Sequence, residues 1–286
     1  MHHIRYFLAV GETLNLTRAA ERCHVAQPAL TRAIKALESE LGGELIRRER
    51  ALSHLTELGQ RMLPMLRQCY DTALAAKMVA ASADELRRLV PSFAAAVDTL
   101  VSRLAESNAG ATAPKVGEPM PSFLLPDEQG RLIRLEDFLG KGPVALAFNR
   151  GHWCPYCRIN INALARAEEE VAAEHRHIAA IVPDRQRFAM WLKSDAKAPF
   201  PVLTDMDNGY ATTLGLAIYV GDELKHMMVT SGWDPSVSQG TDDWMLPIPA
   251  TFIIGTDGIV RARFVDPDYR MRMAIEDMLA ALRSAI

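Results

Sequence analysis

Two of the four cysteines in this 286-residue chain lie three positions apart, in the sequence Cys154-Pro155-Tyr156-Cys157. Sulfur atoms at this spacing can close a disulfide, and the start of a helix stabilises a thiolate through backbone N–H groups and the helix dipole. The pair therefore indicates redox chemistry, with Cys154 as the attacking thiolate and Cys157 as the resolving thiol. Trp153 directly precedes the pair and is expected to line the same site.

Two other interpretations of the cysteine pair remain open. Half of a zinc site would require further ligands to complete about four, normally from a second close pair of cysteines or histidines. Neither Cys23 nor Cys69 supplies such a pair, and both are expected to pack against apolar neighbours. The two thiols could also be inert core residues. Because the sequence offers no further zinc ligands at a suitable spacing, we expect no metal, and we expect no cofactor.

Strand and helix patterns surround the cysteine pair. Residues 144–148 are all apolar and precede the pair, and residues 159–175 follow it with helical periodicity. We expect further strands at 177–182, 201–204, 251–254 and 259–265, and a closing helix at 269–285. The last two strands would form a hairpin across Asp257-Gly258. This alternation predicts an α/β domain for the second half of the chain.

The first half of the chain has helical patterns and almost no strand signal. Helices are expected at 4–10 and 17–23, and a third opens at Pro28 and ends before Gly42-Gly43. Residues 45–56 suit a short two-stranded wing. This order predicts an all-α winged helix-turn-helix over residues 1–58.

Linker helices follow the wing. From residue 58 to residue 79, mostly apolar residues recur at alternating steps of four and three. This spacing predicts a weak heptad seam through which the helix could pair with a second copy of the chain. Pro64 lies inside the pattern and should kink the helix. A further helix is expected at 84–107, with Pro91 as a kink or a restart. Residues 109–114 are small and uncharged, which is typical of a flexible linker. The expected domains are therefore 1–58, linker and dimerisation helices at 59–108, the linker, and an α/β domain at 115–286.

Several polar and basic residues of the first half could contact DNA. A helix-turn-helix places the N-terminal part of its second helix in the major groove, while flanking residues bind phosphates. The candidates are Thr17, Gln27, Pro28, Thr31, Arg32, Lys35, Arg47, Arg48 and Arg50. Residues 1–108 carry 14 Lys and Arg against 12 Asp and Glu, so charge alone leaves open that Arg32 and Lys35 are simply solvated.

The order of residues in this half adds a more specific signal. Its motifs are Ala19-Ala20, Ala26-Gln27-Pro28-Ala29, Leu37-Glu38, Leu41-Gly42, Leu55-Thr56 and Gly59. Together they resemble the LysR-type transcriptional regulators over about residues 1–80. The resemblance implies double-stranded DNA as a partner and a homodimer or a tetramer. Nothing after Ser82 resembles the two-lobed effector domain of that family, so another domain must supply the signal.

A second set of motifs lies between residues 115 and 284. It comprises residues 116–118, 121–123, 148–157, 246–252 and 266–270. These motifs resemble the peroxiredoxin-like, alkyl hydroperoxide reductase branch of the thioredoxin superfamily, which implies a thioredoxin-like fold.

Pro249 matches the cis-proline that faces the active cysteines in that superfamily, although a simple turn proline is the alternative. Peroxiredoxins carry a proline and a threonine seven and three residues before the attacking cysteine, where this chain has Ala147 and Gly151. Dithiol/disulfide exchange therefore fits the pair at least as well as peroxidase chemistry.

Composition narrows the class of protein. The chain is 49% hydrophobic and 23% charged with a net charge of -3, which is typical of a globular protein. It has neither an apolar run of about 18 residues for a membrane span nor the pattern of a signal peptide. We therefore expect a cytoplasmic protein without a membrane partner.

The sequence thus predicts a multidomain chain, with an all-α winged helix-turn-helix and linker helices followed by an α/β thioredoxin-like domain. We expect a redox-responsive DNA-binding transcriptional regulator. A peroxide or a disulfide would be the oxidant, and a thioredoxin- or glutaredoxin-like protein the reductant. The alternative is a thiol peroxidase or disulfide oxidoreductase with a DNA-binding module. A third possibility is a redoxin fold that only binds a partner.

Overall fold

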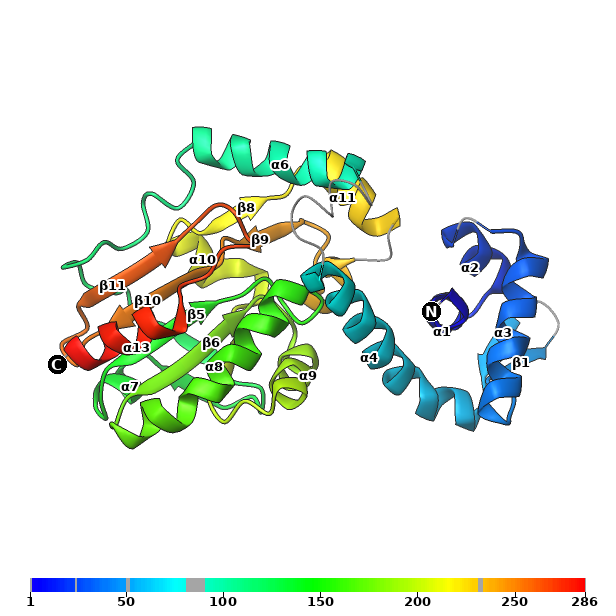
Figure 1. Ribbon diagram of the computed structural model, residues 1–286, viewed down its shortest axis with the longest axis horizontal. Helices are drawn as coiled ribbons and strands as arrows, with labels where there is room; N and C mark the ends of the chain where they lie inside the picture. Colours follow the sequence, from blue (N-terminus) through cyan, green and yellow to red (C-terminus); the bar gives the residue numbers. More distant parts are fainter. Residues whose placement is uncertain (1, 24, 50–51, 81–90, 231–233, 286) are drawn as a thin grey trace. The chain divides into compact units, whose positions relative to one another are not determined.

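The computed structural model describes residues 2–23, 25–49, 52–80, 91–230 and 234–285. The chain forms two compact units, Met1–Ala81 and Ser82–Ile286 (Figure 1). The predicted multidomain organisation is confirmed, and each unit is described separately.

Unit 1 contains four helices and a two-stranded antiparallel wing. The helices are α1 (His2–Thr13), α2 (Leu16–Arg22), α3 (Gln27–Leu41) and α4 (Glu57–Ala80), and the wing is β1 (Ile46–Glu49) with β2 (Leu52–Leu55). The Asn15 side chain begins α2 by accepting the Thr17 and Arg18 backbone N–H groups at 2.9 and 3.0 Å. Gly42, with φ of 74°, ends α3. The predicted winged helix-turn-helix is confirmed.

The expected pairing seam on α4 is divided in the structure. Leu58 and Met62 pack into the core of their own unit, together with the buried Leu66. Met65 is 59% exposed and Cys69 is exposed as a free thiol. Part of the seam thus serves the core of unit 1, and pairing with a second copy stays a prediction.

A five-stranded mixed sheet forms the centre of unit 2. The strand order is β11-β10-β5-β6-β7, where β5 (Val144–Phe148), β6 (His177–Val182) and β7 (Val202–Thr204) run parallel. Strand β10 (Ala250–Ile254) runs antiparallel to β5 and to β11 (Val260–Val265). The strands and the hairpin predicted from the sequence are confirmed.

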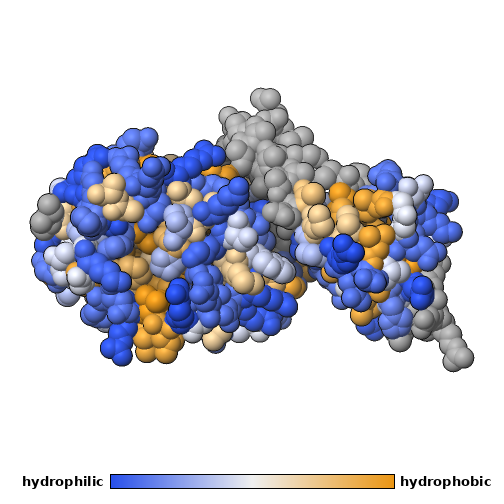
Figure 2. Space-filling model, turned by 90° about the horizontal axis from the view of Figure 1, so that it is seen from below, coloured by the Kyte–Doolittle hydropathy of each residue, from blue (hydrophilic) through white to orange (hydrophobic). Residues whose placement is uncertain are grey.

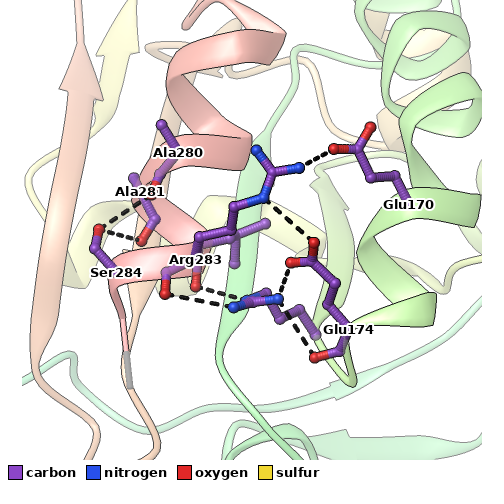
Figure 3. A network of polar contacts seen from close by, with 8 residues as sticks. Glu170, Glu174, Ala280, Ala281, Arg283 and Ser284 are labelled. Atoms are coloured by element: carbon purple, nitrogen blue, oxygen red, sulfur yellow. Dashed lines mark hydrogen bonds and ion pairs between the residues drawn. The ribbon is translucent and has the colours of Figure 1, made fainter.

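The two faces of this sheet pack against different layers. Ala145 and Ala147 of β5 face the cluster that includes residues of α8 (Pro155–Ala173), α9 (Gln186–Ala196) and α13 (Ile275–Ser284). Leu146 and Phe148 face the second cluster, as the alternation of side chains along a strand requires. The guanidinium of Arg283 joins α13 to α8 through Glu170 and Glu174 (Figure 3). Helix α8, which begins at the cysteine pair, is therefore fixed against the sheet.

Shorter elements complete unit 2. They are β3 (Leu124–Pro126), β4 (Leu132–Arg134), α7 (Glu136–Leu139), the 3-10 helix η1 (Met206–Asn208), α10 (Gly209–Thr213), β8 (Ala217–Tyr219), α11 (Asp222–Thr230), α12 (Pro235–Gln239) and β9 (Met245–Pro247). Most of the elements between β7 and β10 carry no clear sequence signal, because they are only a few residues long.

The structure differs from the expected flexible linker at 109–114. Helix α6 (Pro91–Glu106) belongs to unit 2, where its apolar face packs against α11 and Trp244. Ala113 is fully buried, and the Arg263 guanidinium donates to the carbonyl oxygens of Ala113 and Pro114 at 2.6 and 3.1 Å. Small uncharged residues allow this segment to lie close against β11. Of the helix expected at 84–107, residues 84–90 lie outside the described residues, and the described part begins at Pro91.

The closing helix is shorter than the sequence predicts and begins at Ile275 rather than 269. The Asp266 side chain accepts the Asp268 N–H at 2.8 Å, and the Asp268 side chain accepts the Arg270 N–H at 3.0 Å. Such local side-chain bonds compete with helix formation. Residues 266–273 therefore form a turn segment, named here the arginine segment for Arg270 and Arg272.

The surface is mixed in polarity. On the face shown in Figure 2, apolar side chains occur as separate patches among hydrophilic ones on each unit. Within the described part of the chain, no helix combines the length and the apolar character needed to cross a membrane.

Candidate functional site

The cysteine pair lies at the carboxyl end of β5, where the chain enters α8. Cys154 is the residue that caps α8, and Pro155 occupies the first turn. Cys154 is 1% exposed and Cys157 is 0% exposed, and both are free thiols. The sequence prediction of strand, loop and helix around the pair is thus confirmed, and the structure shows the reduced form.

Two N–H donors approach the sulfur of Cys157. The backbone N–H of Arg150 lies 3.2 Å from Cys157 Sγ, and Arg272 Nη2 lies 3.4 Å from it. Burial opposes ionisation, but the Cys154 thiol, the charge of Arg272 and the Arg150 N–H together lower the pKa of Cys157 to about 6. The two donors thus favour a negative charge on Cys157 rather than on Cys154.

The environment of Cys154 has the opposite effect. Burial and the neighbouring Cys157 raise the pKa of Cys154 well above that of an ordinary thiol, despite the charges of Arg150 and Arg272. Its side chain also accepts no capping hydrogen bond from the first turn of α8. The two donors approach Cys157, whereas the sequence predicts Cys154 as the attacking thiolate, and that role stays a prediction.

Aromatic residues and a buried arginine form the wall of the site. The Arg150 guanidinium lies 4.1 Å from the ring centre of Tyr269 and 5.3 Å from that of Trp153. Tyr156 packs edge-on against Tyr269 at 5.7 Å. These cation–π and aromatic contacts fix the residues that flank the pair. Trp153 therefore lies where the sequence placed it, beside the cysteines.

The loop before the pair is anchored to two carboxylates. His152 donates its backbone N–H to Asp184 at 2.6 Å, and its Nε2 lies 3.0 Å from Asp195. Arg158 also bonds Asp195, at 3.1 Å. Burial raises the pKa of Asp184, although bonds from Ser238 and His152 oppose this shift.

Gly151 has no room for a side chain. Its φ is 127°, and a Cβ atom there would lie 2.6 Å from Asp184 Oδ1 and 2.9 Å from Trp153 Nε1. Only glycine tolerates both the backbone angle and this close approach. A threonine, as peroxiredoxins carry three residues before the cysteine, would therefore clash with the carboxylate of Asp184.

Pro249 corrects one prediction. The described residues contain no cis peptide bond, so the expected cis-proline at 249 is wrong. Strand β9 ends at Pro247 and β10 begins at Ala250, while Ile248 donates its N–H to the carbonyl oxygen of Leu216 at 2.8 Å. This bond keeps the chain extended between β9 and β10, and Pro249 lies in the short connection between the two strands.

The candidate DNA-binding residues gather on α2, α3 and the wing. Thr17, Gln27, Pro28, Arg32, Lys35 and Arg47 are exposed, and Thr31 is half-buried. A cleft of about 380 Å³ between α3 and β1 brings together Thr31, Lys35 and Arg47; Leu16, Ile34, Glu38, Glu44 and Ile46 complete its lining. Arg48 lies in β1 and its side chain is outside the described residues, as is Arg50 altogether.

Comparison with known families identifies both halves. A family model described as the AhpC/TSA family matches residues 116–263. The chain belongs to the AhpC/TSA family. A second model, the bacterial regulatory helix-turn-helix protein of the lysR family, matches residues 1–60 of this AhpC/TSA chain. The predicted resemblances to LysR-type regulators and to peroxiredoxin-like proteins are confirmed.

Two curated regulators resemble the N-terminal unit. The HTH-type transcriptional regulator CatR of Pseudomonas putida is 55% identical over 60 residues, which is 21% of this chain and 20% of that protein. The Hca operon transcriptional activator HcaR of Escherichia coli (strain K12) is 39% identical over 83 residues, or 28% of each chain. This chain therefore spans only 20% and 28% of the length of these two relatives.

Two solved structures resemble the C-terminal unit. Peroxidoxin BcpB of Mycobacterium tuberculosis is 23% identical with a TM-score of 0.47, over 60% of this chain and 97% of that one. A mutant peroxiredoxin 6 of Arenicola marina is 18% identical with a TM-score of 0.48, over 59% and 72% of the two chains.

Sequence reasoning missed the residues that set the charge of the pair. Arg272 contacts Cys157 across 115 positions of sequence, and Tyr269 packs on Arg150 from the same segment. Residues 266–270 match the peroxiredoxin-like pattern, and this match was the one available signal. No group of three or more metal-ligating side chains occurs among the residues that the structure describes.

Proposed function

We propose that this chain is a redox-responsive transcriptional regulator in which the thiol state of Cys154 and Cys157 modulates DNA binding. The observation that carries the proposal is the approach of two donors to one buried sulfur, from the Arg150 N–H and from Arg272, in a chain that also carries a lysR-family helix-turn-helix. The thiolate is the reactive form of cysteine, so these donors prepare the pair for oxidation.

Double-stranded DNA is the partner of unit 1 in this proposal. Helix α3 would enter the major groove with Gln27 and Arg32 toward the bases, and Arg47 of the wing would bind phosphate. A homodimer or tetramer would read two half-sites, paired in part through the exposed Met65 and Cys69 of α4.

The burial of both sulfur atoms favours a small oxidant. A hydroperoxide or a low-molecular-weight disulfide needs a smaller opening of the structure than a folded protein does. Either oxidant would close the Cys154–Cys157 disulfide, and a thioredoxin- or glutaredoxin-like protein would reopen it. This reductant would reach the pair only after the loop at residues 150–153 moves.

The second candidate is an enzyme, because the chain belongs to the AhpC/TSA family and the pKa of Cys157 is lowered to about 6. A dithiol/disulfide oxidoreductase fits the site better than a fast thiol peroxidase. Gly151 supplies no hydroxyl for a peroxide, and the position has no space for one.

A DNA-binding titration tests the first candidate. Protein reduced with dithiothreitol and protein carrying the Cys154–Cys157 disulfide are titrated at fixed salt against DNA from upstream of the protein's own gene. The expected result is a changed affinity or footprint in the wild type, and no response to oxidant in Cys154→Ser. Equal binding in both states, with steady turnover of a disulfide and a thiol donor, would favour the enzyme.

A further inference from the structure

The arginine segment contacts both the cysteine pair and α6. Arg272 Nη2 donates to Cys157 at 3.4 Å, and Arg270 Nη2 lies 3.5 Å from Asp98 Oδ1 on α6. We propose that this segment transmits the thiol state of the pair to α6, with the Arg270–Asp98 ion pair as the coupling contact. The proposal rests on the proposed function, in which the pair is a sensor, and names the element that receives its signal.

The arginine segment is held as one piece. Arg270 donates to the two oxygens of Asp268 at 2.7 and 2.8 Å, in the two-pronged geometry that guanidinium and carboxylate groups favour. Arg272 Nη1 donates to the carbonyl oxygens of Tyr269 and Met271 at 2.5 and 2.6 Å. One guanidinium group is thus bonded to the side chain of Asp268 and the other to the backbone of Tyr269 and Met271, within one short segment, so a displacement of Arg272 also shifts Arg270.

Apolar contacts connect the same parts. Trp153, next to the pair, and Tyr269, in the arginine segment, both pack against the cluster that contains Val97, Leu100 and Leu104 of α6. Helix α6 is the first described element of unit 2, and the sequence joins it to α4 through residues 81–90. Among the described elements of unit 2, α6 is therefore the one nearest in sequence to the DNA-binding unit.

Oxidation removes the charge that holds Arg272. The Cys157 thiolate attacks one sulfur of a small disulfide, which breaks its S–S bond and releases one thiolate. Cys154 then gives up its proton to that thiolate and attacks Cys157, which forms the internal disulfide and releases a second thiolate. Two electrons pass from the protein to the small disulfide.

The loss of this charge weakens the contact of Arg272 with Cys157, which is one of the bonds that hold the arginine segment. Arg272 stays bonded to the carbonyl oxygens of Tyr269 and Met271, so a displacement of its side chain moves the backbone next to Arg270. Arg270 then changes its pairing with Asp98, and α6 responds.

Hydrogen exchange of α6 tests this coupling directly. Peptides that cover residues 91–106 are compared in full-length protein reduced with glutathione and oxidised with oxidised glutathione. The wild type should show a protection difference, and Asp98→Asn should lose it. Asp98→Glu, which keeps the charge, and Glu106→Gln, which removes an exposed charge from the same helix, should retain it. Full retention in Asp98→Asn overturns the proposal.

DNA binding separates this proposal from the function on which it rests. Coupling between two sites typically changes affinity by roughly 5- to 150-fold, and that ratio between oxidised and reduced wild type should fall to about one in Asp98→Asn. If the ratio is the same in both proteins, the Arg270–Asp98 coupling is overturned and the sensor function stands. If wild-type affinity ignores the thiol state while α6 still responds through Asp98, the coupling stands and the sensor function fails.

Discussion

Replacing Arg272 by glutamine should raise the pKa of Cys157 and make the disulfide harder to reduce. Arg272 donates to Cys157 Sγ at 3.4 Å, and its positive charge is one cause of the lowered pKa of about 6. Glutamine keeps a donor on a shorter side chain and removes the charge. The reduced form, whose negative charge Arg272 stabilises, should therefore lose stability relative to the disulfide.

The size of the effect follows from the contact. A hydrogen bond to a charged group contributes about 1.5–3 kcal/mol, and one pKa unit corresponds to about 1.4 kcal/mol. The pKa of Cys157 should then rise by about one to two units. For a two-electron couple about 30 mV corresponds to 1.4 kcal/mol, so the reduction potential should fall by about 30 to 65 mV.

Two measurements check this prediction. The Cβ chemical shifts of labelled cysteine report ionisation against pH, in a background with Cys23→Ala and Cys69→Ser so that only the pair titrates. Equilibration in glutathione buffers gives the potential. Arg283→Gln removes a positive charge from α13, away from the sulfur atoms, and serves as the matched control. An unchanged pKa of Cys157 in Arg272→Gln would refute the reasoning.

Three further predictions concern other parts of the chain. Gly151→Ala should destabilise unit 2 by about 1–3 kcal/mol, because φ is 127° and the new methyl group would clash with Asp184. Urea unfolding measures this loss of stability, and an unchanged midpoint would contradict the prediction. Folding lowers the pKa of Cys157, so the free energy of unfolding of the reduced protein should rise as pH increases from about 6 toward 9 and fall as pH decreases. The change should reach about 1.4 kcal/mol per pH unit. In unfolding curves recorded at several pH values, Cys157→Ser should remove this dependence on pH. Gln27→Ala should weaken binding to the specific DNA site alone, by about 1–3 kcal/mol. Arg47→Ala should weaken binding to every DNA sequence and lower the slope of log K against log salt concentration by about 1. Equal losses of affinity on specific and random DNA for Gln27→Ala would show that Gln27 does not contact bases.

Local signals in the sequence predicted much of the fold. The turn at Gly42 and the uninterrupted apolar run at 144–148 each determine their element within a few residues, and the structure has both. The elements between residues 205 and 247 escaped prediction, since each is short and depends on packing against distant residues. The linker prediction at 109–114 failed for the same reason, because Arg263 holds that segment from 150 positions away.

The candidate site divides in the same way. The spacing of Cys154 and Cys157 predicts a dithiol, but it does not indicate which of the two sulfur atoms is more easily ionised. That assignment depends on Arg272, whose approach requires the chain to return from β11 to the start of α8. Pairwise contacts of this range have no local sequence pattern, so they emerge only from the folded structure.

In the proposed regulator, the anchoring of the loop before the pair would also set how fast an oxidant reaches the sulfur atoms. Both sulfur atoms are buried, so an oxidant reacts only with molecules in which the loop has opened, and the observed rate is the chemical rate multiplied by the open fraction. Each 1.4 kcal/mol of loop stability slows oxidation about tenfold. In the proposed regulator, the bonds of His152 to Asp184 and Asp195 would thus set the rate of oxidation, which can change while the chemistry at sulfur stays the same.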